Sequence, residues 1–359
     1  MTAPLRIGIF VAAALFATAA PAAAAPEETA RPTVPSPPPG ALPEPIGGGI
    51  PEEDQEEIRK PITLFLEGGR EFTGDVAKVE DGAVSLRVVQ EGGEIVLSFP
   101  KADIREIFFP GGNILERTRT MVEEGRLAEA LPYLEALIAR RFPLFDLIPE
   151  EGRSLYAAIP MAALAIDRPA QAIAYANALS PYMTLREDAE AMRDAELLGR
   201  YILELNEEAM LLARQWIEEE GRYGPSALGY FILGALLFAG EDYEGALRTA
   251  LEPIVFSGQI PMSYLPHCYS LAIASAHALE DEAHRDRLLA EARERGFAWQ
   301  PLRVLGGAGD DLEGLVIEDD EGEPLPLFEA TTDGERLLED REESVGTGNF
   351  VDPSRLIPL

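Results

Sequence analysis

The sequence predicts a multidomain α and β protein, in which a small five-stranded β-barrel is followed by a solenoid of α-α helical hairpins. Between residues 61 and 110, five short apolar stretches are separated by glycine-containing turns, a pattern typical of small all-β domains. Between residues 113 and 297, an alanine-centred pattern recurs at a nearly fixed interval, which indicates stacked helical hairpins. The rest of the chain is predicted as a signal peptide, a proline-rich linker and an acidic tail, over residues 1–24, 25–60 and 308–359.

The first 24 residues have the layout of a secretory signal. Arg6 supplies a positive charge, Ile7 to Ala20 form an apolar stretch of 14 residues, and Ala22 to Ala24 offer small residues for cleavage. The stretch is short for a membrane span, which needs roughly 20 residues, and an uncleaved membrane anchor is the alternative. We therefore expect an exported bacterial protein, periplasmic or secreted, with no membrane span in the mature chain.

Residues 25–60 contain many prolines, a Gly47–Gly49 run and an acidic run from Glu52 to Glu57. Prolines favour extended polyproline II structure, and a segment with so few apolar residues cannot build a core of its own. The composition predicts a disordered spacer, and a ligand for a proline-binding domain is the alternative.

The predicted barrel consists of five stretches of strand length. They cover residues 62–66, 72–79, 84–88, 95–99 and 104–107. Gly74, inside the second stretch, predicts the bulge or sharp bend that small barrels need in order to close. This pattern resembles SH3-like and Sm-like barrels over about 50 residues. The resemblance to bacterial SH3 domains implies peptidoglycan binding as one function, and a structural or pairing module is the other interpretation.

The helical part is predicted from alanines that mark the second helix of each hairpin. The markers are Ala130, Ala172, Ala209, Ala246 and Ala283, at intervals of 42, 37, 37 and 37 residues. In the best-defined unit, Tyr230, Leu233, Gly234 and Leu237 precede Ala246 at helical spacing. This unit resembles the tetratricopeptide repeat (TPR), and the resemblance implies about five hairpins and a protein-binding role.

The same resemblance implies a concave face, formed by the first helix of each hairpin, that would bind a partner. The residues predicted to line this groove are Met161, Leu164, Leu198, Tyr201, Phe231 and Phe238. Phe231 and Phe238 are seven residues apart and so share one face of a helix. The alternative is that neighbouring helices, or the tail, bury these side chains.

The tail, residues 308–359, has 16 acidic residues and three arginines. Two apolar islands, Pro324–Phe328 and Leu356–Leu359, interrupt it, and islands of this kind often dock on a groove. A disordered segment that only increases solubility is the alternative interpretation.

Composition excludes several classes of function. The net charge of −33 repels nucleic acid and anionic lipid, so neither is an expected partner. The chain has three histidines and one cysteine, Cys268, which do not form a zinc-ligand pattern. No nucleophile, acid–base pair or phosphate loop stands out. We therefore predict no catalytic residues, no cofactor and no metal.

Two hypotheses of function remain. The first is a non-enzymatic scaffold of the cell envelope, in which the helical array binds an unidentified protein partner. The second is a wall-associated module, in which the barrel binds peptidoglycan or another glycan. The barrel has five phenylalanines but no Trp or Tyr, and its alternation places most of these rings in a core, which favours the scaffold.

Overall fold

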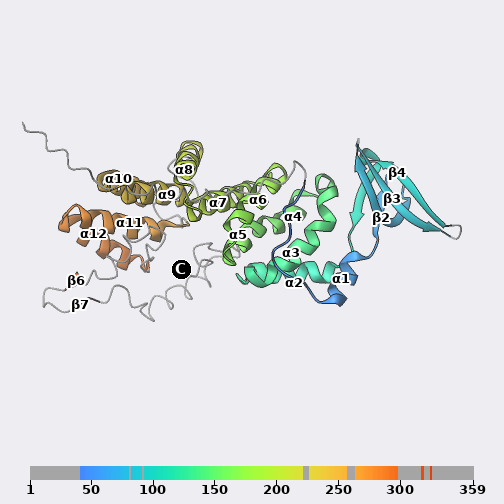
Figure 1. Cartoon of the computed structure of the whole chain (residues 1–359), viewed down its shortest axis with the longest axis horizontal. Coiled ribbons are helices and arrows are strands. Elements are labelled where there is room, and N and C mark those ends of the chain that lie inside the picture. Colours follow the sequence, from blue (N-terminus) through green and yellow to red (C-terminus); the bar gives the residue numbers. More distant parts are fainter. Residues whose placement is uncertain are drawn as a thin grey trace, which may run out of the picture. The chain divides into compact units, whose positions relative to one another are not determined.

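The computed structural model describes residues 41–80, 82–90, 93–220, 226–256 and 263–297, together with a short β-hairpin of β6 (Ile317–Glu318) and β7 (Pro324–Leu325). A five-stranded sheet comes first and the helical region follows (Figure 1). The predicted signal peptide, residues 25–40 and nearly all of the acidic tail lie outside the described residues, so the predictions for them stay predictions.

The second half of the predicted linker is folded, which corrects the expectation of disorder for residues 41–60. Helix α1 (Glu52–Arg59) forms there, with three acidic residues in its first turn, where they interact favourably with the helix dipole. Ile50 and Ile58 are buried in the same apolar cluster as the first helices of the helical region, and Ile46 packs against it. These three isoleucines, in a stretch otherwise rich in proline, glycine and acid, help to hold it, since each adds apolar area to an existing core.

The sheet contains all five predicted strands. They are β1 (Ile62–Leu66), β2 (Glu71–Glu80), β3 (Ala83–Gln90), β4 (Gly93–Pro100) and β5 (Ile104–Phe108), with the short 3₁₀ helix η1 (Lys101–Asp103) before β5. All neighbouring strands are antiparallel, and their order is β4-β3-β2-β1-β5. In the described residues the end strands β4 and β5 do not pair, so the sheet is open and its closure into a barrel is not observed.

The bend expected at Gly74 lies where β2 changes its partner. β2 pairs with β1 as far as Gly74 and with β3 from Asp75 onward, and its register shifts between Val76 and Lys78. A Cβ atom on Gly74 would lie 2.4 Å from the carbonyl oxygen of Arg87. Glycine is therefore needed for the close approach of β2 and β3 at this point.

The open sheet completes its core with residues from outside the strands. Leu144, in the 3₁₀ helix η2 (Phe142–Leu147), is fully buried in the sheet core, and Leu147 packs against it. The guanidinium of Arg141 lies 5.0 Å from the centre of the Phe109 ring, and Lys101 Nζ lies 2.6 Å from Asp146 Oδ2. A segment of the helical region thus supplies apolar contacts that barrel closure would otherwise provide.

Eleven α-helices follow the sheet in the described residues. They are α2 (Gly112–Glu123), α3 (Leu127–Arg141), α4 (Glu150–Arg153), α5 (Ala158–Ala165), α6 (Pro169–Leu179), α7 (Arg186–Ile202), α8 (Asn206–Glu220), α9 (Leu228–Ala239), α10 (Tyr243–Phe256), α11 (Leu265–Ala278) and α12 (Glu282–Glu294). Two further 3₁₀ helices are η3 (Ser154–Ala157) and η4 (Ser180–Tyr182). Contacts join α2 to α3, α5 to α6, α7 to α8, α9 to α10 and α11 to α12.

The same turn joins the two helices of each of these five pairs. One residue in each turn has a positive φ, and these residues are Gly125, Asp167, Glu204, Glu241 and Glu280. The amide of that residue donates to the carbonyl three positions back, and the next amide donates to the carbonyl five positions back. This is the Schellman arrangement that satisfies the last carbonyls of a helix. The helical region is therefore internally repetitive.

Four of the five alanine markers occupy equivalent places. Ala130, Ala172, Ala209 and Ala246 are each the fourth residue of a second helix, and each is fully buried. Ala283 is wrong as the fifth marker, because it is the second residue of α12 and is exposed. The last turn comes two residues later than a strict 37-residue repeat predicts.

Candidate functional site

The predicted groove residues lie inside the helical region. Leu198, Tyr201, Phe231 and Phe238 are buried in one apolar cluster, and Met161 is buried in a second. The sixth, Leu164, is half-buried and packs against both clusters. These side chains offer little surface to a partner. Their burial agrees with the alternative that neighbouring helices cover them, and whether a partner binds there stays a prediction.

The burial of Phe231 and Phe238 follows from the helices around them. The Phe231 ring lies 5.1 Å from the ring of His267 on α11, and the Phe238 ring lies 5.0 Å from that of Tyr243 on α10. Helix α9 contacts α7, α8, α10 and α11. Its sequence is almost entirely apolar, and a helix that is apolar on every side is stable only when it is buried on every side.

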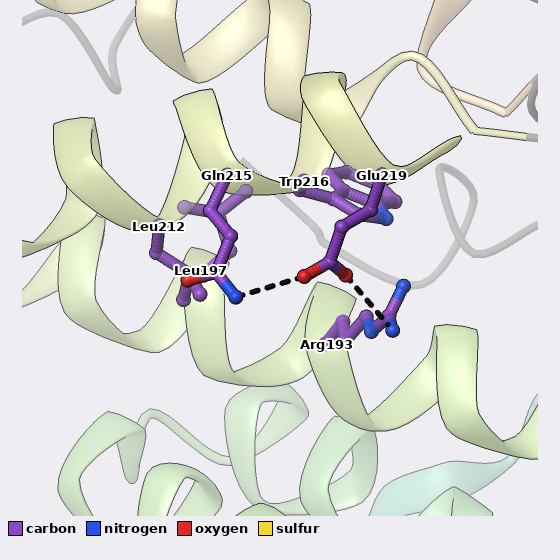
Figure 2. Close-up of a pocket in the computed structure, with 6 residues that line it drawn as sticks. All are labelled: Arg193, Leu197, Leu212, Gln215, Trp216 and Glu219. Atoms are coloured by element: carbon purple, nitrogen blue, oxygen red, sulfur yellow. Dashed lines mark hydrogen bonds and ion pairs between the residues drawn. The ribbon is translucent and has the colours of Figure 1, made fainter. Parts of the chain in front are cut away.

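A small pocket lies between α7 and α8 (Figure 2). Glu219 accepts a hydrogen bond of 2.8 Å from Gln215 Nε2 and forms an ion pair with Arg193, with Nη2 and Oε2 3.1 Å apart. The Trp216 ring forms part of the wall, and the cavity volume is about 40 Å³. That volume admits a few water molecules and is far below the roughly 300 Å³ of a small-molecule site.

Next to this pocket in sequence, Asp194 is a buried carboxyl group. Ser226 Oγ donates to its Oδ2 at 3.3 Å, while Oδ1 has no hydrogen-bond partner in the described part of the chain. Burial raises the pKa of Asp194 to about 8, and the nearby Glu190 charge acts in the same direction. A shifted pKa is often a sign of function. Here the cause is burial first, and the described contacts of Asp194 are those with Ser226 and Glu190.

The most unusual polar cluster is centred on Glu135 in the middle of α3. This carboxylate is only 4 % exposed. Its Oε1 accepts hydrogen bonds from the backbone amide of Ile46 at 2.9 Å and from Tyr175 Oη at 2.7 Å. Its Oε2 accepts from the backbone amide of Gly47 at 2.8 Å. Two consecutive amides of the N-terminal segment are thus held by one side chain of the helical region.

The physical chemistry of this cluster is demanding. A buried charge costs several kcal/mol unless hydrogen bonds replace its hydration, and three donors do so here. Burial raises the pKa of Tyr175, and its hydrogen bond to Glu135 raises it further. Tyr175 therefore stays protonated as a donor over the whole ordinary pH range.

The segment approaches α3 very closely at Gly47. A Cβ atom there would lie 2.7 Å from the backbone nitrogen of Pro132 and 2.9 Å from Glu135 Oε2. Any other residue at position 47 would therefore have to move the segment away from the helix. A Cβ atom on Gly49, two residues later, would meet nothing within 4 Å.

A cavity of about 340 Å³ lies between this segment, α1 and α3. Its walls are largely apolar and include Ile50, Ile58 and Ala139, while Arg59 and Arg140 supply positive charge. Arg140 Nη2 donates to the backbone carbonyl of Lys60 at 3.1 Å, but the buried Nε has no partner in the described residues. In volume this cavity falls in the range of ligand sites.

The site around Glu135 was not predicted from the sequence, although one signal for it exists. Glu135 follows Leu134 and precedes Ala136, Leu137 and Ile138, so it lies on a helix whose residues are mostly apolar. A carboxylate in such a position indicates a buried partner. Nothing in the sequence shows that the partner is a pair of backbone amides 88 and 89 residues away.

Cys268 and the histidines do not form a reactive centre. Burial raises the pKa of the Cys268 thiol, whose Sγ lies 3.8 Å from the carbonyl oxygen of Ala227. Among the described residues, no three His, Cys, Asp or Glu side chains are grouped closely enough to hold a metal ion.

Comparison with protein-family models, with curated proteins and with solved structures finds no significant match to this chain. In the described part of the chain, no helix combines the length and the apolar character needed to cross a membrane.

Proposed function

We propose that the chain is a non-enzymatic scaffold of the bacterial cell envelope, which binds a partner protein through a TPR-like helical array. The observation that carries the proposal is that the helical region already holds a peptide segment that belongs to no helix or strand, through backbone hydrogen bonds to Glu135. The repeated turns support the array, because repeated helical hairpins commonly serve as binding surfaces.

The cell-envelope location rests on the sequence of residues 1–24, whose charged start, apolar stretch and small residues match a secretory signal. N-terminal sequencing of the mature protein from its native host tests this. Cleavage after Ala23 or Ala24 is expected, and a chain that keeps Met1 would contradict export by a cleaved signal.

A glycan-binding, SH3-like sheet is the second candidate. The sheet does expose apolar side chains, namely Val89, Ile95, Val96 and Phe108. Three of these four are aliphatic, whereas sugars are commonly bound against flat aromatic rings. The exposed surface therefore fits a protein partner better than a glycan.

Site-specific photo-crosslinking separates the two candidates. A photoreactive residue is placed in the full chain at Leu211 on α8 or Val255 on α10, and in matched strains at Val96 or Phe108 on the sheet; all four side chains are exposed. The scaffold hypothesis predicts one protein adduct from the helical positions, and saturable binding of that protein to the purified chain. Adducts to wall fragments from the sheet positions alone would favour the glycan hypothesis and contradict the scaffold.

A further inference from the structure

The segment that carries Ile46 and Gly47 contacts the helical region as a bound peptide would. It bends at Gly47, it donates two successive backbone amides to one carboxylate, and it buries Ile50 in the apolar cluster. Ile46 also packs against that cluster. Backbone hydrogen bonds together with apolar side-chain contacts are a usual means by which proteins recognise peptide segments.

We propose that α3 and α6 form a peptide-binding site, occupied in cis by residues 41–50 and open to a segment of a partner protein when the cis segment is displaced. The carboxylate of Glu135 accepts the backbone hydrogen bonds of the bound segment. Tyr175 of α6 donates a hydrogen bond that holds this carboxylate in place. This inference rests on the proposed scaffold function, to which it adds a binding site and a means of regulation.

The geometry fixes the chemistry of the partner segment. Its two consecutive residues at the Glu135 site must both have an amide hydrogen, which excludes proline. The second must be glycine, because a Cβ atom would meet the backbone of Pro132. The first is apolar, as Ile46 is. A partner segment of this kind has an apolar residue followed by glycine, and its chain bends at that glycine as the cis segment does.

The cis segment is a replaceable ligand because it fits the surface incompletely. It does not occupy the cavity of about 340 Å³ beside Gly48 and Gly49, and apolar surface that lines such a cavity stays accessible to a ligand. Glycine also loses more conformational freedom on ordering than any other residue. Covalent attachment compensates, since it gives the segment a high effective concentration. A partner segment with a side chain at the position of Gly49 has room to fill the cavity.

The test uses the full chain and a fluorescent synthetic peptide with the sequence of residues 41–51. Gly47→Ala places a Cβ against Pro132 and releases the cis segment while Glu135 stays intact. Gly49→Ala is the matched control, since nothing lies near its Cβ position. Fluorescence anisotropy should show at least ten-fold tighter peptide binding to Gly47→Ala than to the wild type or to Gly49→Ala.

A second substitution identifies the receptor. Glu135→Gln, added to Gly47→Ala, should weaken peptide binding by at least ten-fold, because the amide group accepts fewer and weaker hydrogen bonds from the backbone. Glu129→Gln, on the exposed face of the same helix, should leave binding unchanged. Ile46→Pro removes one of the two donated amides and serves as an independent way to release the segment.

Hydrogen exchange at residues 46 and 47 reports release directly. Equal peptide binding to all variants, or binding that survives Glu135→Gln, would overturn the proposed site. Persistent protection of the segment in both Gly47→Ala and Ile46→Pro would overturn its displacement. None of these results changes the crosslinks from Leu211 and Val255, so the scaffold hypothesis stands or falls separately.

Discussion

The sheet and the helical region differ in the size of their apolar cores. The sheet has a core of few residues, borrows Leu144 from η2 to complete it, and leaves several large apolar side chains exposed. The helical region has two far larger apolar clusters. It also contains the buried carboxyl group of Asp194 and four non-glycine turn residues with positive φ. The small core of the sheet therefore depends on residues of the helical region, whereas the large clusters stabilise the helical region despite groups that are costly to bury or to strain.

The largest expected effect tests the dependence of the sheet. Leu144→Ala should reduce the free energy of unfolding by about 2–5 kcal/mol, the usual range for a buried leucine. Hydrogen exchange should show the loss first in β1 to β5, since Leu144 packs in their core. The control is Leu211→Ala, whose side chain is 71 % exposed and should cost little. Equal loss of protection in α9 to α12 would contradict the comparison.

The next largest effect concerns the free-energy cost of ionising the buried side chain of Asp194. Its pKa is raised to about 8 when folded, whereas an unfolded aspartate ionises near pH 4. Folding must therefore take up a proton between these values, and the wild type loses stability as the pH rises from 4 to 8. Asp194→Asn removes this dependence.

As the pH rises from 4 to 8, the free energy of unfolding of Asp194→Asn should increase relative to that of the wild type by an amount on the order of a few kcal/mol. Above pH 8 the difference should stay constant. Thermal or urea unfolding at several pH values measures it. Asp188→Asn is a useful comparison, because burial also raises the pKa of Asp188 while its bond to Ser154 lowers it. A difference between wild type and Asp194→Asn that is constant with pH would show that Asp194 ionises normally.

The smallest effect concerns the turns. Glu241 has a φ of 62°, a conformation that costs a side-chain-bearing residue about 1 kcal/mol and costs glycine almost nothing. Glu241→Gly should therefore stabilise the chain by about 1 kcal/mol. The reverse change at the equivalent turn, Gly125→Ala, should destabilise it by a similar amount. Chemical denaturation of both variants checks the pair, and equal signs would contradict the equivalence of the turns.

The sequence predicts the local features of this fold well. The five strands follow from alternation and glycine turns, and four of the five hairpins follow from their alanine markers, because both patterns depend on neighbours in sequence. The fifth hairpin is misplaced by two residues, since Ala283 lies in an acidic helix end where the pattern is weak. Barrel closure depends on whether the end strands of the sheet pair with each other, which no single strand reveals. In this sheet Leu144 of η2 supplies part of the core.

The site is less predictable for a physical reason. Whether Phe231 faces a groove or a core depends on how closely α11 packs against α9, which no pattern within one helix reveals. The folding of residues 41–60 is not predicted when the composition is averaged over residues 25–60, because the many prolines outweigh the three isoleucines in that average. The Glu135 site is not predictable because two of the three hydrogen-bond donors to Glu135 are backbone amides, which have no sequence signature.

The burial of Cys268 makes the chain convenient for chemical labelling. It is the only cysteine in the sequence. It is fully buried with a raised thiol pKa, so the reactive thiolate is scarce and shielded from reagents. A cysteine introduced at an exposed position therefore reacts selectively with a fluorophore or spin label, without removal of the native one. Pairs of such labels can report distances within the folded chain while its core remains intact.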